Sequence, residues 1–109
     1  VGNLGSARDF SDVRDIVRGY ALLMERGGPG EAYNLCRGEA LTIGSIVDLL
    51  QSEIAVSFEV VEEGTRVRRR EIPRIVGNPA RAQALGWEPR IPFRQTLRDL
   101  LDYWRRGGV

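Results

Sequence analysis

Apolar residues recur at helical spacing in two stretches of the first half of the chain. In residues 12–26 they stand three and four positions apart, at Val13, Ile16, Val17, Tyr20, Ala21 and Met24. This spacing predicts an amphipathic helix, which Ser11 or Asp12 can cap and a Gly-Gly-Pro-Gly run ends. A second helix is predicted from Thr42, a capping residue, to residue 54.

Two more helices are predicted in the second half. Asn78 can cap a short one, with Pro79 at its first position, where a missing N–H costs nothing, and with Gly86 at its end. The last helix follows Ile91-Pro92 and ends at Gly107-Gly108. Its apolar face is formed by Phe93, Leu97, Leu100, Leu101 and Trp104. Both tryptophans, Trp87 and Trp104, are expected in the core.

Short apolar runs between the helices predict strands. Residues 32–36 are mostly apolar and follow a glycine-rich turn, and residues 56–62 largely alternate apolar and polar side chains. Residues 73–76 are a third, shorter extended piece, and the polar stretch 62–70 is expected to be a loop. Alternating helices and strands of this kind indicate an α/β fold, in which the first helix returns to a strand of a Rossmann-like layer.

The composition limits the chemistry. All sixteen basic residues are arginine, because the chain has neither lysine nor histidine. No Schiff-base lysine, histidine base, histidine metal ligand or Ser-His-Asp triad can be built from this chain alone. Cys36 is a single cysteine, so neither a disulfide framework nor a zinc site is available. We therefore expect no catalytic, cofactor-binding or metal-binding residue in this chain.

The charge and hydropathy of the chain limit the partners that it is expected to bind and the cell compartment in which it is expected to act. The formal net charge of +1 and an arginine run without interleaved aromatic residues argue against nucleic-acid binding. No apolar run is long enough to span a membrane, and the N-terminus lacks the regions of a signal peptide, so a cytoplasmic protein is expected. The start at Val1 and a single methionine inside a predicted helix indicate a fragment of a longer protein.

An arginine group is the main candidate for a binding site. It comprises Arg66, Arg68, Arg69 and Arg70, directly ahead of Glu71. The planar guanidinium fork can hold phosphate oxygens through two parallel hydrogen bonds. The alternative is a solvated loop whose charge nearby glutamates offset. Arg8 is a second candidate, since it precedes a helix N-terminus; the alternative there is a capping region stabilised by Asp9 or Asp12.

Three segments together resemble a known family. They read GNLGSARDFSDVRDIVRGY, GEAYNLC and RVRRREIPRIVGNPARAQALGWEPRIPFRQTLRDLLDYW. In order and spacing they resemble the C-terminal third of extended short-chain dehydrogenase/reductases acting on nucleotide sugars, above all the GDP-4-dehydro-6-deoxy-mannose reductases, with the GDP-mannose 4,6-dehydratases as near relatives. The resemblance implies a Rossmann-edge helix and strand in residues 1–36 and a small mixed α/β substrate domain in residues 37–109.

The resemblance also implies a binding site, residue by residue. The arginine of the family's Arg-Asp-Phe falls on Arg8, and that of its Arg-Pro-x-Asp/Glu segment falls on Arg68. Both are thereby implied to contact the nucleotide diphosphate. The acidic residue of the second segment falls on Glu71, near the ribose, and the family's Gly-Asn-Leu falls on Asn3 and Leu4, at the border of the nucleotide pocket.

The chain also departs from the family pattern. Arg69 stands where the family has a proline that would fix the backbone, so the register of the arginines stays open and Arg66 is kept as a further substrate-binding candidate. The family binds NAD(P) at a glycine-rich turn and uses a Tyr-x-x-x-Lys pair, but the chain has no GxGxxG and no lysine. We expect it to be inactive alone, with NAD(P) bound only in the intact parent enzyme.

The functional prediction is therefore a partial site. The chain is expected to bind the nucleotide diphosphate of a sugar, as a GDP-sugar in a reductase, and to need the missing N-terminal Rossmann domain. Ser11-Asp12 after Arg-Asp-Phe favours a reductase over a dehydratase. The alternatives are a dehydratase or sugar-nucleotide epimerase fragment, and a non-catalytic module that forms a homo-oligomer through the apolar faces of residues 12–26 and 32–36.

Overall fold

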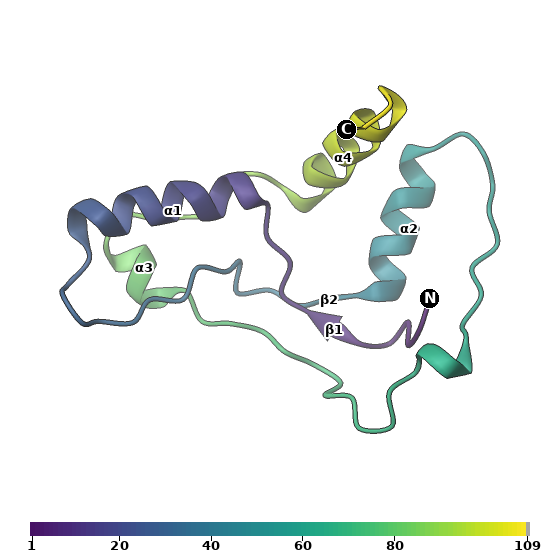
Figure 1. The fold of residues 1–109 in the computed structure, drawn as a ribbon, viewed down its shortest axis with the longest axis horizontal. Helices are drawn as coiled ribbons and strands as arrows, with labels where there is room; N and C mark the ends of the chain where they lie inside the picture. Colours follow the sequence, from purple (N-terminus) through teal and green to yellow (C-terminus); the bar gives the residue numbers. More distant parts are fainter. Residues whose placement is uncertain (109) are drawn as a thin grey trace.

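The computed structural model describes residues 1–108 as four α-helices, a 3-10 turn and a small sheet joined by long extended segments (Figure 1). The helices are α1 (Val13–Arg26), α2 (Ile43–Glu53), α3 (Ala80–Ala84) and α4 (Phe93–Arg105), the strands are β1 (Ala7–Arg8) and β2 (Leu41–Thr42), and the 3-10 turn is η1 (Gly64–Arg66). The radius of gyration is 16.6 Å, against about 13 Å for a compact domain of this length. The chain is therefore flat and open.

The small sheet connects three distant parts of the chain. β1 pairs antiparallel with β2, with Ala7 opposite Thr42 and Arg8 opposite Leu41. On its other side Ala7 forms a parallel bridge to Arg74, through an N–H donated to the Pro73 carbonyl at 2.9 Å and a carbonyl that accepts from Ile75 at 3.0 Å. The predicted extended piece 73–76 is thus confirmed. β1 was not predicted, because two residues are too short to show a strand period.

The predicted helices are confirmed, together with most of their signals for starting and ending, but α3 begins at Ala80, with Pro79 at its N-cap and not at its first position. The Asp12 carboxylate caps α1 by accepting from the Arg14 N–H at 2.8 Å, and the Thr42 hydroxyl accepts from the Ser45 N–H at 3.0 Å. Asn78 accepts from the Ala80 N–H at 3.0 Å at the start of α3. After α3 the chain turns at Gly86, whose φ of 100° only glycine adopts readily.

The two longer predicted strands, 32–36 and 56–62, are wrong for this chain. Both segments lie in extended or irregular backbone, and neither joins a ladder within residues 1–108. Residues 56–58 instead bond to one side chain, since the Gln51 amide donates to the Val56 carbonyl and accepts from the Phe58 N–H. Alternation of side chains indicates which face is apolar, but a strand also needs a neighbouring backbone, which the pattern does not supply.

The core is small. Ala82, Trp87 and Leu97 are the buried apolar residues of the described chain. Trp87 is 3% exposed and donates its indole N–H to the Asp15 carbonyl at 2.9 Å, as expected of a core tryptophan. The expectation for Trp104 is wrong: this side chain is 63% exposed and stacks edge-on against Tyr103. Most of its surface is left uncovered by the described residues.

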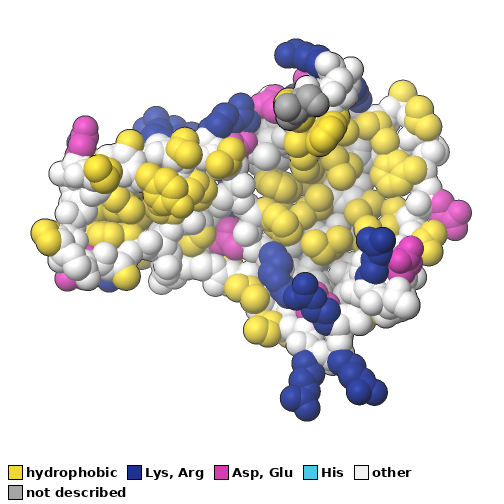
Figure 2. Space-filling model, viewed as in Figure 1, with side chains coloured by type: hydrophobic (Ala, Val, Ile, Leu, Met, Phe, Trp, Pro, Cys, Tyr) yellow, Lys and Arg dark blue, Asp and Glu magenta, His cyan; other side chains and the backbone are white. Residues whose placement is uncertain are grey.

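α1 turns its polar side inward. Its buried residues are Asp15 and Gly19, whereas its exposed apolar residues are Val13, Val17, Tyr20 and Met24. Figure 2 shows hydrophobic side chains along this helix and across the region between α2 and α4. The amphipathic helix is as predicted, but most of its apolar face, at Val13, Val17, Tyr20 and Met24, is exposed in the described chain.

Candidate functional site

A cavity of about 440 Å³ lies beside the small sheet. It is lined by Val1, Gly2, Asn3, Arg8, Ile43, Arg66, Arg68 and Glu71. The N-terminal residues and the loop 66–71 are far apart in sequence, and η1 and the sheet bring them to the same place (Figure 1). Five of the six predicted substrate-binding residues therefore share one cavity.

Leu4 is the predicted residue that does not line it. Its N–H donates to a Glu62 carboxylate oxygen at 3.1 Å, and its carbonyl accepts from the Gly44 N–H at 2.9 Å. These bonds attach the N-terminal segment to the glutamates before η1 and to the first turn of α2. Leu4 thus supports one wall of the cavity through its backbone.

Arg8 is the most firmly held of the cavity's cations. Its backbone lies in β1, which has hydrogen-bonded neighbours on both sides. One terminal nitrogen donates to the Ala7 carbonyl at 2.8 Å, and the other lies 3.7 Å from a Glu71 carboxylate oxygen. The Arg8 and Glu71 side chains are 28% and 23% exposed. A half-buried guanidinium on a fixed backbone is well placed to bind an anion with little loss of side-chain freedom.

The loop arginines separate into two pairs. Arg66 and Arg68 line the cavity, whereas Arg69 and Arg70 are exposed and outside it. Arg66 donates from Nε to Glu63 at 2.8 Å, and Arg68 makes no ion pair within residues 1–108. The lining thus holds three guanidinium groups and one carboxylate, which favours a ligand with several negative charges.

Asp9 is a structural residue of this site whose role the sequence did not reveal. Its carboxylate accepts three backbone N–H bonds, from Arg37 at 3.0 Å, Gly38 at 2.9 Å and Gly77 at 3.2 Å. It therefore ties two later segments to the end of β1, while Asp12 alone caps α1. No local pattern marks an acceptor for such distant backbone groups, so the sequence could not have shown it.

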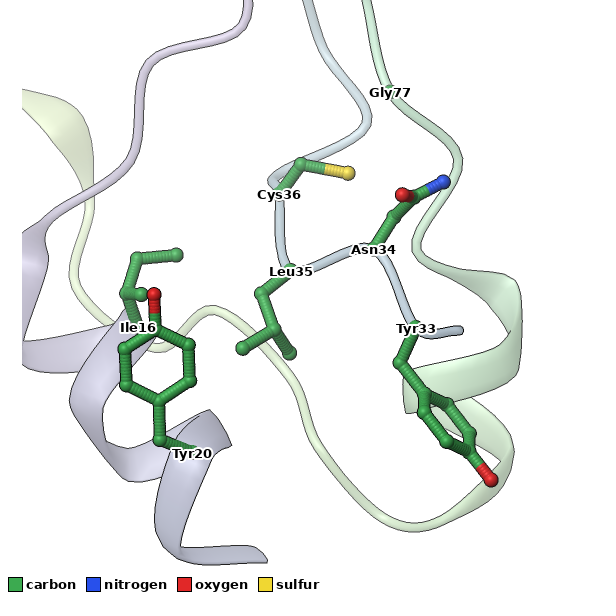
Figure 3. A pocket seen from close by; sticks show the side chains of 7 residues that line it. All are labelled: Ile16, Tyr20, Tyr33, Asn34, Leu35, Cys36 and Gly77. Atoms are coloured by element: carbon green, nitrogen blue, oxygen red, sulfur yellow. The ribbon is translucent and has the colours of Figure 1, made fainter. Parts of the chain in front are cut away.

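A second cavity, of about 360 Å³, lies between α1 and residues 33–36 (Figure 3). Ile16, Tyr20 and Leu35 face one another there, while the Tyr33 ring points away. Burial, with Asp9 nearby, raises the pKa of the Cys36 thiol. A neutral thiol is a poor nucleophile, which favours a packing role for Cys36 over a reactive one.

Two further kinds of site find no support in the described residues. Across residues 1–108, no three histidine, cysteine or carboxylate side chains are grouped closely enough to hold a metal ion. Within the same residues, no helix is long and apolar enough to cross a membrane. The cavity at Arg8 and Arg68 is the remaining candidate.

Comparison with known proteins identifies the family of the chain. Residues 1–100 match the family model described as GDP-mannose 4,6 dehydratase. The chain belongs to this family. It is 37% identical over 105 residues to the GDP-6-deoxy-D-mannose reductase of Pseudomonas aeruginosa, covering 95% of this chain and 34% of that protein. It is 30% identical to a putative GDP-L-fucose synthase 2 of Oryza sativa subsp. japonica, covering 96% and 30%.

Solved structures show the same fold. The chain superimposes on RMD of Pseudomonas aeruginosa, a structure complexed with NADPH, with a TM-score of 0.90 at 36% identity, covering 98% of this chain and 35% of that one. For the UDP-glucose 4-epimerase of Thermotoga maritima, solved with UDP-glucose, the TM-score is 0.88 at 27% identity, covering 97% and 34%. The chain spans about a third of these relatives, so it is a fragment of the extended short-chain dehydrogenase fold.

Proposed function

We propose that this chain is the nucleotide-sugar-binding portion of an NAD(P)-dependent enzyme of the GDP-4-dehydro-6-deoxy-mannose reductase kind. One observation supports it most directly. Arg8 and Arg68, which are far apart in the sequence, line a cavity that also contains Glu71 and Asn3. A diphosphate carries enough negative charge to satisfy two guanidinium groups together.

The arrangement suggests a role for each side chain. Arg68 has no competing carboxylate within the described residues, so it can bind a phosphate oxygen without first breaking an ion pair. Arg8 keeps Glu71 nearby at 3.7 Å, which leaves this carboxylate able to accept hydrogen bonds from ribose hydroxyls. Asn3 uses Oδ1 to accept from the Gly5 N–H at 2.9 Å, so its amide N–H₂ faces no such bond and can donate to the ligand.

The reacting chemistry is assigned to the rest of the intact enzyme. This chain has no lysine to pair with a tyrosine, and its glycine runs do not fit a dinucleotide. Residues 27–30 follow the C-terminus of α1, and residues 107–108 follow that of α4. The dipole at those ends is negative and disfavours a pyrophosphate. When bound elsewhere in the intact enzyme, NAD(P) would supply the hydride.

The contribution of this chain to catalysis would be positioning. Binding energy from the diphosphate, remote from the reacting carbon, would hold the sugar in a reactive orientation. A mutation at Arg68 would thus impair turnover of the intact enzyme without touching the bond that changes. Dehydratases and epimerases of the same fold would also need to bind the diphosphate of their substrate, so they remain alternatives for the intact enzyme.

A binding experiment tests the proposal directly. GDP titrated into the chain is expected to shift the backbone NMR signals of Arg8, Arg68 and Glu71. Arg68→Ala is expected to weaken GDP binding by about tenfold, the effect of one lost charge-assisted contact. Arg70→Ala removes the same charge from the exposed part of the same loop and is expected to leave binding unchanged. Equal effects of the two substitutions would rule out a specific cavity.

A second candidate function is a self-associating module without catalysis. The exposed apolar face of α1 favours it, because four large side chains there lack a covering element within residues 1–108. Such a module would not need the cavity. It is therefore distinguished from the first proposal by the GDP titration above and by the state of association in solution.

A further inference from the structure

We infer that Arg66 reads the O6 and N7 edge of a guanine base and so selects guanine nucleotides at this cavity. The inference rests on the proposed function, because it needs a nucleoside diphosphate held by Arg8 and Arg68. It goes further by assigning Arg66 a task different from that of its neighbours.

Arg66 is fixed by one residue and by the opposite wall. Its backbone N–H donates to the Glu63 carbonyl at 2.9 Å, and its Nε donates to the Glu63 carboxylate at 2.8 Å. Its own carbonyl lies so close to Gly2 that a Cβ there would be 2.7 Å from the oxygen. η1 therefore presses Arg66 against the N-terminal wall of the cavity.

The ion pair with Glu63 makes Arg66 the least suited of the three arginines to a phosphate. Its charge is already balanced, whereas Arg68 makes no ion pair within residues 1–108. Because Arg66 bonds to Glu63 through Nε, its two terminal nitrogens remain available to a ligand. They make no hydrogen bond within the described part of the chain. Two parallel N–H groups in one plane match two adjacent acceptors better than they match a single charge.

Guanine offers that pair of acceptors. Its O6 and N7 lie side by side and form the commonest bidentate contact with arginine, whereas adenine presents the N6 amino donor beside N7. Pyrimidines have no equivalent of N7. The apolar side chains of Val1 and Ile43 also line the cavity and can cover the faces of a base. The same cavity thus contains groups for the diphosphate, the ribose and the base.

The test compares nucleoside diphosphates by calorimetry with the whole chain. GDP and IDP share O6 and N7 and are expected to bind equally. ADP, UDP and 7-deaza-GDP are expected to bind about tenfold more weakly, within the range of one bidentate base contact. Arg66→Ala is expected to lower the GDP affinity to that of ADP and to leave ADP unchanged. The matched control, Arg70→Ala, is expected to preserve the preference.

A second variant separates the effect of the paired guanidinium donors from that of the positive charge. Arg66→Lys keeps the positive charge but not the paired donors, so it is expected to lose the guanine preference as Arg66→Ala does. Retention of the preference by the lysine variant, or an equal loss of GDP and ADP affinity in Arg66→Ala, would overturn the inference. So would equal binding of all the diphosphates by the natural chain, which leaves the proposed function standing. Failure of every diphosphate to bind would overturn both.

Discussion

Asp9 shows how one side chain can hold a site that it does not line. Its carboxylate accepts from the backbone of Arg37, Gly38 and Gly77, next to the arginine proposed to bind the diphosphate. An Asp9→Ala change leaves three N–H groups without this acceptor. Two of these N–H groups are partly buried and one is exposed. Because hydrogen bonds to a charged group are lost, we expect a loss of about 1–3 kcal/mol in the free energy of unfolding, measured with urea.

The control for this prediction is Asp48→Ala on the exposed side of α2. It removes the same charge but should change the free energy of unfolding by less than about 0.5 kcal/mol. Similar losses in both variants would show that net charge, and not the three backbone bonds, governs the effect.

The residues of the site were predictable to an unequal degree. Arg8, Arg68 and Glu71 came from a resemblance carried over position by position, and the cavity unites them. Asp9 and Glu63 could not have been found, because their partners are set by how loops meet in space. Arg66 was left open by the sequence, and its bond to Glu63 is what distinguishes it from Arg68.

At the scale of elements, α1 is attached to the C-terminal half by buried carboxylates. The Arg14 guanidinium and the Thr96 hydroxyl bond to Asp12 and hold the pKa of that carboxyl far below its usual range. Burial opposes ionisation of Asp15, but the Arg90 N–H, the Arg18 guanidinium and the Ile91 N–H together outweigh it. The pKa of Asp15 is lowered as a result. Both groups therefore stabilise α1 in their charged form.

This arrangement predicts acid sensitivity. A carboxyl whose pKa is lower in the folded chain stabilises the fold above its unfolded value of about 4, and this contribution is lost as the pH falls below that value. We expect the urea concentration at the midpoint of unfolding to decrease as the pH is lowered from 5 to 2.5. Asp15→Asn should be less stable at pH 7 and should depend less on pH in this range. If the stability of Asp15→Asn depended on pH as strongly as that of the natural chain, Asp15 would not be a source of the acid sensitivity.

The helices were predictable because their signals are local, whereas the strands were not. Asp12, Thr42, Asn78 and Gly86 mark helix ends within a few residues of chain, and the structure uses each of them. Residues 32–36 have strand-like composition but no neighbouring strand in the described chain. Sheet formation depends on contacts distant in sequence, which a pattern of apolar residues does not contain.

At the scale of the whole molecule, polar contacts hold the chain together while apolar surface faces outward. Among residues 1–108, three apolar residues are buried, and the chain spans about a third of its relatives. Val17 and Met24 on the outer face of α1 are 53% and 88% exposed. A stripe of this kind is typical of a surface that another domain or another copy of the chain covers.

The stripe predicts concentration-dependent association of the isolated chain. Replacing Val17 and Met24 by glutamate should yield a monomer in sedimentation velocity with unchanged helix content, because neither side chain packs against the described chain. The matched control places the same two charges at Val56 and Val61, which are also exposed but lie away from α1, and it should associate like the natural chain. A natural chain that stays monomeric at high concentration would exclude the self-associating module and leave the α1 face to a different domain.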